Sequence, residues 1–274
     1  MKAEYLKLYS KTEQKRMQAL DALFAKWKEV VGDKDGYWFV PDGFYPNYLG
    51  QTTRILYLAR DSYDLYGEDD PLGETTYIEK FVRQYLAGRM DSQNTRNGVN
   101  INRIKFHKML IQVAYGLIHN CPWTAKNPDT PQIPYASEIC EGGKVFERAS
   151  FAFMNLCKWS HESTQGTNAA WDAVNEFVEK SATQKRNFFL EEVELLDPHI
   201  IITMNFGPDL ISRWTGNLAK SVDTKNENCF VYSLSSGNKE YMIFDPWHFS
   251  STRKSEERDI YNPLLKMTRK YYPR

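Results

Sequence analysis

The sequence predicts an α/β protein with a mostly parallel central sheet flanked by helices on both faces, which is a three-layer α/β/α arrangement. Short apolar runs rich in β-branched and aromatic residues occur at 54–59, 149–156 and 198–204, and longer segments with helical periodicity separate them. Strands that alternate with helices form parallel sheets, because each crossover helix covers a face of the sheet. The 274 residues, of which 42% are hydrophobic, suffice for one such domain with a sizeable core.

The N-terminal part of the chain is expected to be a helical extension, about 50 residues long, of a single domain that spans residues 1–274. Apolar residues recur at helical spacing between 11 and 31, and Gly32 ends this pattern. Segment 37–49 contains two prolines and six aromatic residues, which indicates an ordered loop.

The remaining elements alternate along the chain. Helical periodicity predicts helices at 76–86, 104–118, 171–180, 185–196, 209–214 and 255–274. Besides the three apolar runs, strands are expected at 229–234 and 241–244. The polar segments 87–102 and 122–134 are expected to be loops.

Composition excludes several classes of protein. The 35 basic and 35 acidic residues cancel, so any phosphate-binding patch must be local, and a histone-like or tail-driven nucleic-acid binder is excluded. The four cysteines form no Cys-x-x-Cys pair, so no zinc or iron–sulfur site is expected, and reduced thiols in a cytoplasmic protein are the default. No apolar run approaches membrane-spanning length, so no membrane partner is expected.

Polar side chains follow several of the predicted strands. Asp61 comes after the first, Asn155 closes the second, Asn205 follows the third, and Asp245 and His248 follow the last. The carboxyl ends of parallel strands meet at one edge of a sheet, so an acid, an amide and an imidazole are expected in one cleft. Taken alone, this constellation fits many α/β enzymes.

The sequences of these segments, and their order along the chain, resemble motifs of the uracil-DNA glycosylase superfamily. Ala-Arg-Asp-Ser-Tyr-Asp at 59–64 resembles the Gly-Gln-Asp-Pro-Tyr-His motif that follows a strand in that family. Phe-Met-Asn-Leu at 153–156 resembles the strand whose asparagine reads the edge of the flipped base. Segment 195–202 resembles the helix, proline and strand that precede the last motif, and 244–250 occupies the place of the final His-Pro-Ser loop. The resemblance spans roughly residues 55–251, with divergent stretches between the motifs.

The resemblance implies a role for each matching residue. Asp61 takes the place of the carboxylate that positions water, Tyr63 that of the aromatic wall beside the base, and Asn155 that of the residue that reads the base edge. His248 would stabilise the departing base as a hydrogen-bond donor, and Asp245 stands at the first position of the final motif. Asp61 has a purely structural alternative, as a helix cap or as an ion-pair partner of Arg60 or Arg54.

Further residues belong to the expected site. Ser62 and Asp64 replace the proline and the histidine of the first motif and would contact the base. Arg60, Arg253 and Lys254 are candidates for contacts with DNA phosphates. For the aromatic side chain that stacks on the base, the candidates are Tyr85 and Met90.

These residues predict a monofunctional DNA glycosylase that needs no cofactor and no metal, with DNA as its partner and a monomeric state. Because Ser62, Asp64 and Asp245 depart from the uracil-reading pattern, the expected substrate is a modified or damaged base. Hypermodified pyrimidines of phage DNA are one such class, with antiviral defence as the setting. Two alternatives remain open: a glycosylase-like module that binds nucleic acid without catalysis, and an α/β enzyme that acts on small nucleosides.

Overall fold

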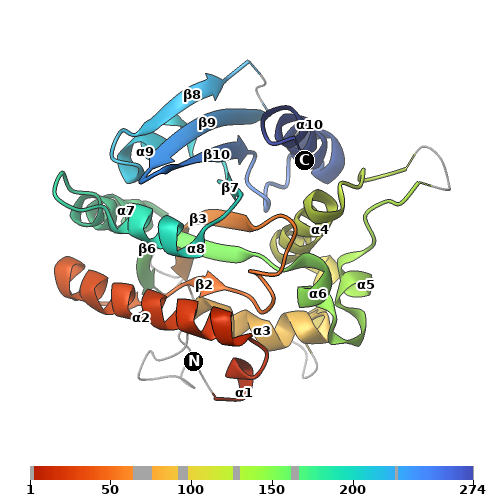
Figure 1. Ribbon diagram of the computed structural model, residues 1–274, viewed down its shortest axis with the longest axis horizontal. Coiled ribbons are helices and arrows are strands. Elements are labelled where there is room, and N and C mark those ends of the chain that lie inside the picture. Colours follow the sequence, from red (N-terminus) through yellow and green to blue (C-terminus); the bar gives the residue numbers. More distant parts are fainter. Residues whose placement is uncertain are drawn as a thin grey trace.

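An eight-stranded sheet organises the computed structural model, which describes residues 3–63, 76–91, 98–125, 130–161, 167–225 and 228–273, with backbone only at 62, 63, 161 and 167–170 (Figure 1). The strand order is β1-β6-β3-β7-β10-β9-β8, and β2 also pairs with β6. The bounds are β1 Trp38–Phe39, β2 Gly43–Phe44, β3 Ile55–Tyr63, β6 Ala152–His161, β7 Ile200–Ile202, β8 Ala219–Asp223, β9 Cys229–Ser236 and β10 Lys239–Pro246.

The predicted fold class is confirmed. The four central strands β6, β3, β7 and β10 run parallel, and antiparallel strands flank them at both edges. A separate two-stranded ladder joins β4 (Arg89–Met90) to β5 (Val99–Asn100).

Helices cover both faces of the sheet. The helices are α1 Ala3–Leu6, α2 Lys11–Val31, α3 Tyr77–Ala87, α4 Lys105–His119, α5 Ala136–Cys140, α6 Val145–Ala149, α7 Thr167–Ser181, α8 Phe188–Leu196, α9 Gly207–Trp214 and α10 Asn262–Tyr271. Short 3₁₀ turns occupy η1 Ile101–Arg103 and η2 Glu141–Gly143, and a π-helical turn, η4 Glu256–Tyr261, leads into α10. Helices α2, α7, α8 and α9 pack on one face, and α3 to α6 with α10 pack on the other.

The alternation of side chains along β3 explains why both faces need a helical layer. Ile55, Tyr57 and Ala59 enter the core beneath α3 and α4, whereas Leu56 and Leu58 enter the core beneath α2 and α7. A strand with apolar residues on both sides is stable only when both sides are buried. β3 therefore contributes to the cores on both faces of the sheet.

The N-terminal segment is part of the layered domain. Ser10 and Glu13 form a reciprocal capping box that begins α2, and Gly32, with φ of 72°, ends the helix at the predicted position. The buried face of α2, which includes Trp27, packs in one core with α7 and α8. Two pieces of the predicted loop at 37–49 are the short strands β1 and β2, which extend the sheet beyond β6.

The two strands that carry the first motifs are longer than predicted. β3 continues to Tyr63, with a register shift between Asp61 and Tyr63, so Asp61 lies within the strand. β6 continues to His161 because β1 pairs with its second half, which places Asn155 in mid-strand opposite Ala59. The sequence placed residues 60–63 and 157–161 outside the strands because they are more polar than the runs before them. Pairing with neighbouring strands extends both strands through these residues.

The order of the parallel strands creates a crevice. The chain leaves β3 toward β6 on one side and leaves β7 toward β10 on the other side. Ligands of open α/β sheets bind outside the carboxyl ends of the strands at such a reversal. The ends of β3 and β7 therefore define where a site is expected.

Candidate active site

A cavity of about 620 Å³ lies at the carboxyl ends of the four parallel strands. Every one of these strands, or the loop that follows it, contributes to its wall, and the N-terminal parts of α3, α4 and α7 close its sides. The lining residues are Ala59, Arg60, Asp61, Tyr77, Phe81, Ile104, Phe106, His107, Phe153, Asn155, Trp171, Met204, Asn205, Phe206, His248 and Ser250. The structure thus brings Asp61, Asn155 and His248 together, as the sequence predicted.

The carboxylate of Asp61 is nearly buried, with a side-chain exposure of 5%, and it forms an ion pair with its neighbour. Arg60 donates from Nε to Oδ1 of Asp61 at 2.6 Å, and its guanidinium lies 4.7 Å from the ring centroid of Trp171. The ion pair considered for Asp61 is therefore present. It places a fixed positive charge beside the carboxylate, and it directs Arg60 toward the cavity wall.

The hydrogen bonds of His248 determine which of its two ring nitrogens carries the proton. The backbone N–H of Ser250 donates to Nδ1 of His248 at 3.2 Å, and the Ser250 hydroxyl lies 2.7 Å from the same atom. An atom that accepts a backbone N–H carries no proton, so neutral His248 carries its proton on Nε2. Burial, with a smaller effect of Arg60, lowers the pKa of His248, while Asp61 opposes the change. The ring stacks on Phe106 at a centroid distance of 5.8 Å.

The side-chain amide of Asn155 is hydrogen-bonded through its nitrogen, and its oxygen has no donor among the described residues. Its backbone N–H and its Nδ2 both donate to the carboxylate of Asp42, at 2.5 and 2.9 Å. Its Oδ1 is buried and accepts no hydrogen bond from the described residues. A buried carbonyl oxygen without a donor is costly, so this atom marks a place where a ligand N–H or O–H would be stabilised.

Asp245 is not among the residues that line the cavity. Its carboxylate accepts hydrogen bonds from the hydroxyl of Thr203 at 2.7 Å and from the backbone N–H groups of Phe206 and Gly207, both at 2.9 Å. Burial raises the pKa of Asp245, and these hydrogen bonds oppose that shift. The residue ties β10 to the loop between β7 and α9, which itself forms part of the cavity wall.

The other predicted site residues lie in different places. The backbone of Ser62 and Tyr63 belongs to β3, and Asp64 lies outside the described residues. Arg253 is exposed, and Lys254 places its Nζ 3.8 Å from the ring centroid of Trp247. Both cations follow the His248 loop directly in the chain.

Most of the aromatic wall was missed from the sequence. Tyr85 and Met90, the candidates for stacking on a base, are buried in the core and are not among the residues that line the cavity. Aromatic rings from three helices, one strand and one loop do so instead; they are Tyr77, Phe81, Phe106, Phe153, Trp171 and Phe206. Tyr77 and Phe153 stack with a centroid distance of 4.3 Å and an interplanar angle of 4°.

His107 is a second imidazole in the wall that the sequence did not single out. Its Nδ1 lies 2.7 Å from the hydroxyl of Tyr85, and its ring packs on Phe81 at 4.6 Å. Burial lowers the pKa of His107 to about 3, so the ring is neutral near pH 7. The only sequence signal was a Phe106–His107 pair at the start of a predicted helix, which ordinarily indicates packing.

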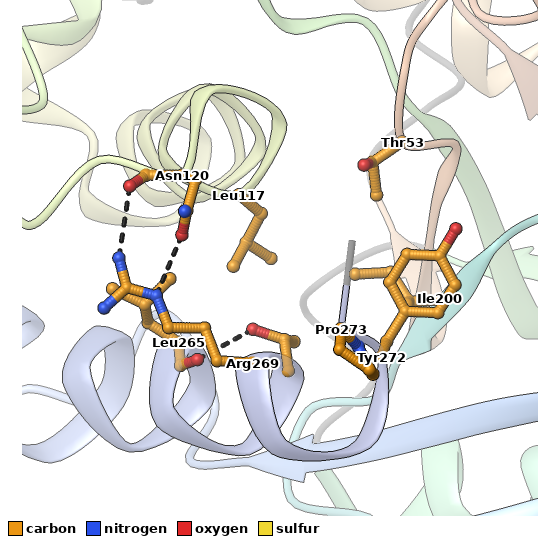
Figure 2. Close-up of a pocket in the computed structure, with 9 residues that line it drawn as sticks. Thr53, Leu117, Asn120, Ile200, Leu265, Arg269, Tyr272 and Pro273 are labelled. Carbon is orange, nitrogen blue, oxygen red and sulfur yellow. Dashed lines mark hydrogen bonds between the residues drawn. The ribbon is translucent and has the colours of Figure 1, made fainter.

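A smaller cavity of about 230 Å³ lies at the opposite end of β3 and β7 (Figure 2). Thr53, Ile200 and Tyr272 form one side, and Arg269 forms another with its Nε donating to Oδ1 of Asn120 at 2.8 Å. Among the described residues that line it, none carries a carboxylate or an imidazole. The chemistry-bearing residues thus gather at the carboxyl ends of the strands.

Within the described ranges, no group of three or more His, Cys, Asp or Glu residues is arranged to hold a metal ion. All four cysteines are buried free thiols. Among the described helices, none combines the length and apolar character needed to cross a bilayer. Comparisons with models of protein families, with known proteins and with solved structures find no match for this chain.

Proposed function

We propose that this protein is a DNA glycosylase that hydrolyses the N-glycosidic bond of a flipped, modified base and leaves an abasic site. The observation that carries the proposal is the meeting of Asp61, Asn155 and His248 between aromatic rings in one cavity. Each has the chemistry that a separate part of the reaction needs. The resemblance of segments 59–64, 153–156 and 244–250 to glycosylase motifs supports the same reading.

The reaction builds positive charge on the sugar and negative charge on the departing base. The Asp61 carboxylate stabilises the oxocarbenium-like sugar and orients the water that attacks C1′. As the C–N bond breaks, Nε2–H of His248 donates a hydrogen bond to the base, which leaves with the bonding electron pair. The attacking water adds its hydroxyl to C1′, and its remaining proton ends on the base or in solvent.

The walls of the cavity favour a base that carries an additional substituent. Aromatic rings stack on any base through its π face, which suits a nucleotide turned out of the helix. Pockets of roughly 300–1,000 Å³ hold drug-sized molecules, and about 620 Å³ lies well inside that range. A hypermodified pyrimidine, as found in phage DNA, is the substrate class that we favour, with Arg253 and Lys254 as candidates for phosphate contacts.

Mass spectrometry of the bases released from genomic DNA tests the proposal. The purified protein is incubated with several genomic DNAs, including phage DNA with modified cytosines, and the products are compared with those of Asp61→Asn. We expect a released base and alkali-labile sites with the wild-type protein, and a loss of roughly 10²–10⁴-fold in the variant. Release of no base from any of these DNAs would contradict the proposal.

The ion pair between Arg60 and Asp61 favours a second candidate, a module that binds nucleic acid without catalysis. A carboxylate neutralised by a guanidinium at 2.6 Å stabilises a cationic sugar less than an isolated one would. Binding of phage DNA in a gel-shift experiment, without base release and with equal affinity for the Asp61→Asn protein, would support this candidate.

A further inference from the structure

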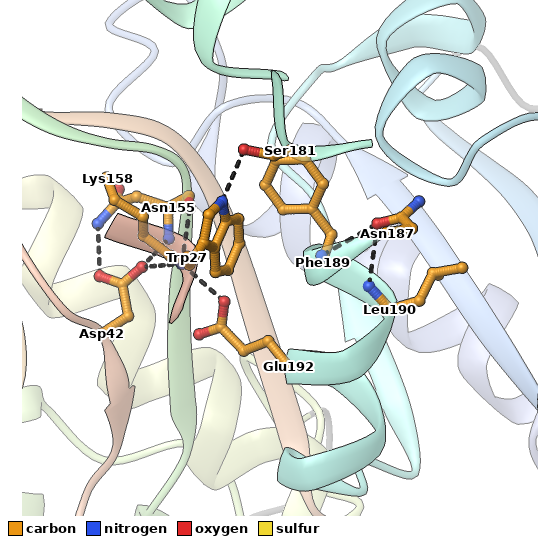
Figure 3. Close-up of polar contacts among 9 residues, drawn as sticks. All are labelled: Trp27, Asp42, Asn155, Lys158, Ser181, Asn187, Phe189, Leu190 and Glu192. Atoms are coloured by element: carbon orange, nitrogen blue, oxygen red, sulfur yellow. Dashed lines mark hydrogen bonds and ion pairs between the residues drawn. The ribbon is translucent and has the colours of Figure 1, made fainter. Parts of the chain in front are cut away.

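Asn155 is oriented by a buried polar cluster, defined here as Asp42, Lys158 and Glu192, whose side chains are completely shielded from solvent (Figure 3). The Lys158 ammonium donates to Asp42 at 2.6 Å, to Glu192 at 2.7 Å and to the backbone oxygen of Asn155 at 2.9 Å. Its three donors therefore each have an acceptor. The cluster lies directly behind the cavity wall that Asn155 forms.

The backbone explains why Asp42 reaches Asn155. The N–H of Val40 still donates to the backbone oxygen of Lys158 at 2.7 Å, and the strand pairing between the N-terminal segment and β6 is interrupted at Pro41-Asp42, between β1 and β2. Proline has no N–H to continue a ladder, and the Asp42 side chain takes the place of a backbone acceptor for the N–H of Asn155. The other carboxylate oxygen of Asp42 then accepts from Nδ2 of Asn155.

We propose that Asp42 is a positioning residue that fixes the amide of Asn155 with its oxygen available to the ligand, so that the cavity selects a ligand edge that donates an N–H. A carboxylate only accepts hydrogen bonds, so Asn155 must turn its Nδ2 toward Asp42. Oδ1 is then the atom left without a donor. This inference rests on the proposed base-binding role of the cavity and adds a residue to it that no motif contains.

The substitution Asp42→Asn is expected to invert Asn155. Two donors, Nζ of Lys158 and N–H of Asn155, point at the same Oδ2 atom of Asp42, so the amide oxygen of the variant must take that position. Its new NH₂ group then faces Nδ2 of Asn155, which is a clash of two donors. Rotation of the Asn155 amide relieves the clash and presents NH₂ to the cavity.

Glu192→Gln is the matched control. It removes the other carboxylate bonded to the same ammonium, and it leaves both hydrogen bonds between Asp42 and Asn155 in place. Each variant retains one carboxylate beside Lys158, so both are expected to fold with a balanced pair in the core. Far-UV circular dichroism and thermal unfolding verify this before binding is compared.

The first measurement needs no ligand. Hydrogen exchange of the Asn155 side-chain amide, followed by ¹⁵N NMR, is expected to be slow in the wild-type protein and in Glu192→Gln, and fast in Asp42→Asn. Equal exchange in all three folded proteins would overturn the inference. This readout does not depend on glycosylase activity, so failure of the proposed function and failure of the positioning role are distinguishable.

The second measurement compares two oligonucleotide probes, one with deoxyuridine, whose N3–H donates, and one with the 2-pyrimidinone deoxynucleoside, whose N3 accepts. The wild-type protein and Glu192→Gln are expected to favour the donor probe, and Asp42→Asn to shift the ratio of affinities toward the acceptor probe by about tenfold or more, as a buried unpaired group predicts. An unchanged ratio in Asp42→Asn would count against the role of Asp42. Binding of neither probe by any of the proteins would count against base reading by the cavity.

Discussion

At the scale of single residues, His248 offers a sharp prediction because its tautomer is determined. Its Nδ1 accepts from the backbone N–H of Ser250, so Nε2 carries the proton of the neutral ring. We expect ¹⁵N NMR to show a protonated Nε2, an unprotonated Nδ1 and a pKa below the ordinary value of 6.5 for His248. A pKa above 6.5, or a proton on Nδ1, would contradict this assignment.

The lowered pKa of His248 also predicts how the rate of base release responds to pH and to substitution of this residue. The neutral ring is the resting donor, and a lowered pKa keeps it neutral from pH 7 upward, so this group causes no loss of rate between pH 7 and 8.5. His248→Ala is expected to reduce the rate by roughly 10²–10³-fold, as for removal of one donor to a developing anion. Single-turnover release at pH 7.5 measures the effect, and His248→Gln, which restores a donor, is expected to recover part of it.

Site residues near the ends of apolar runs were predictable from the sequence, and site residues on helices were not. Asp61, Asn155 and His248 were identified from polar side chains near the ends of apolar runs, and all three line one cavity. His107 and Phe106 were missed because helical periodicity looks the same for a buried wall and for a ligand-binding wall. Asp42 was missed because it lies 113 positions from Asn155, a distance that no local pattern spans.

At the scale of elements, Asp245 connects the end of β10 to the start of α9. Asp245→Asn keeps one acceptor oxygen but turns an NH₂ group toward the N–H of Phe206 or Gly207, which leaves a donor without a partner. We expect a loss of about 1–3 kcal/mol in the free energy of unfolding, measured by urea denaturation. Base release should fall less than in Asp61→Asn, since Asp245 acts on the loop and not on the sugar.

Asp209→Asn is the control for that experiment. Asp209 lies in the first turn of the same helix and is exposed, so its substitution removes the same charge without touching the loop. Its effect on the free energy of unfolding should stay within about 0.5 kcal/mol. Equal losses for both variants would show that the charge near α9, and not the anchor, matters.

The predicted and observed ends of helices and strands differ in how well they agree. The helix from Lys11 to Val31 was predicted at its observed position from apolar periodicity and from the glycine that ends it, and the structure adds a capping box at its start. The strands β3 and β6 were predicted too short, because their second halves are held by pairing with each other and with β1. Local signals identify helix ends well, whereas strand ends depend on neighbours that are distant in the chain.

At the scale of the whole molecule, the parallel sheet was predicted but its strand order was not. Alternating strands and helices imply parallel pairing, yet many orders satisfy that rule. The observed order puts β3 and β7 inside the group of parallel strands and creates the reversal between them, where the cavity lies. The convergence of the strand ends therefore followed from fold class alone, while the shape of the cavity did not.

The buried polar cluster couples the stability of the whole fold to pH, because it joins an edge segment, the sheet and the helix α8. Asp42 accepts from Asn155 as well as from Lys158, whereas Glu192 has only Lys158 as a partner and its Oε1 has none among the described residues. Glu192 is thus the group that takes up a proton. Burial, opposed by Lys158 and reinforced by the negative charge of Asp42, raises the pKa of Glu192 to about 7.

The raised pKa means that the folded protein binds this proton more tightly than the unfolded chain, whose glutamate has the ordinary value of 4.5. The contribution of Glu192 to stability is therefore complete below pH 4.5 and is lost as the pH rises to about 7. The difference in unfolding free energy between the wild-type protein and Glu192→Gln should fall by roughly 2–4 kcal/mol across this window. Urea denaturation from pH 4.5 to 8 measures it. Glu191→Gln is the control, because Glu191 lies beside Glu192 on α8 but is half-exposed and pairs with Arg186. It should show no comparable trend. If this difference in unfolding free energy does not change between pH 4.5 and 8, Glu192 remains ionised beside Lys158 over the whole range. The buried polar cluster would then keep its net negative charge in the core.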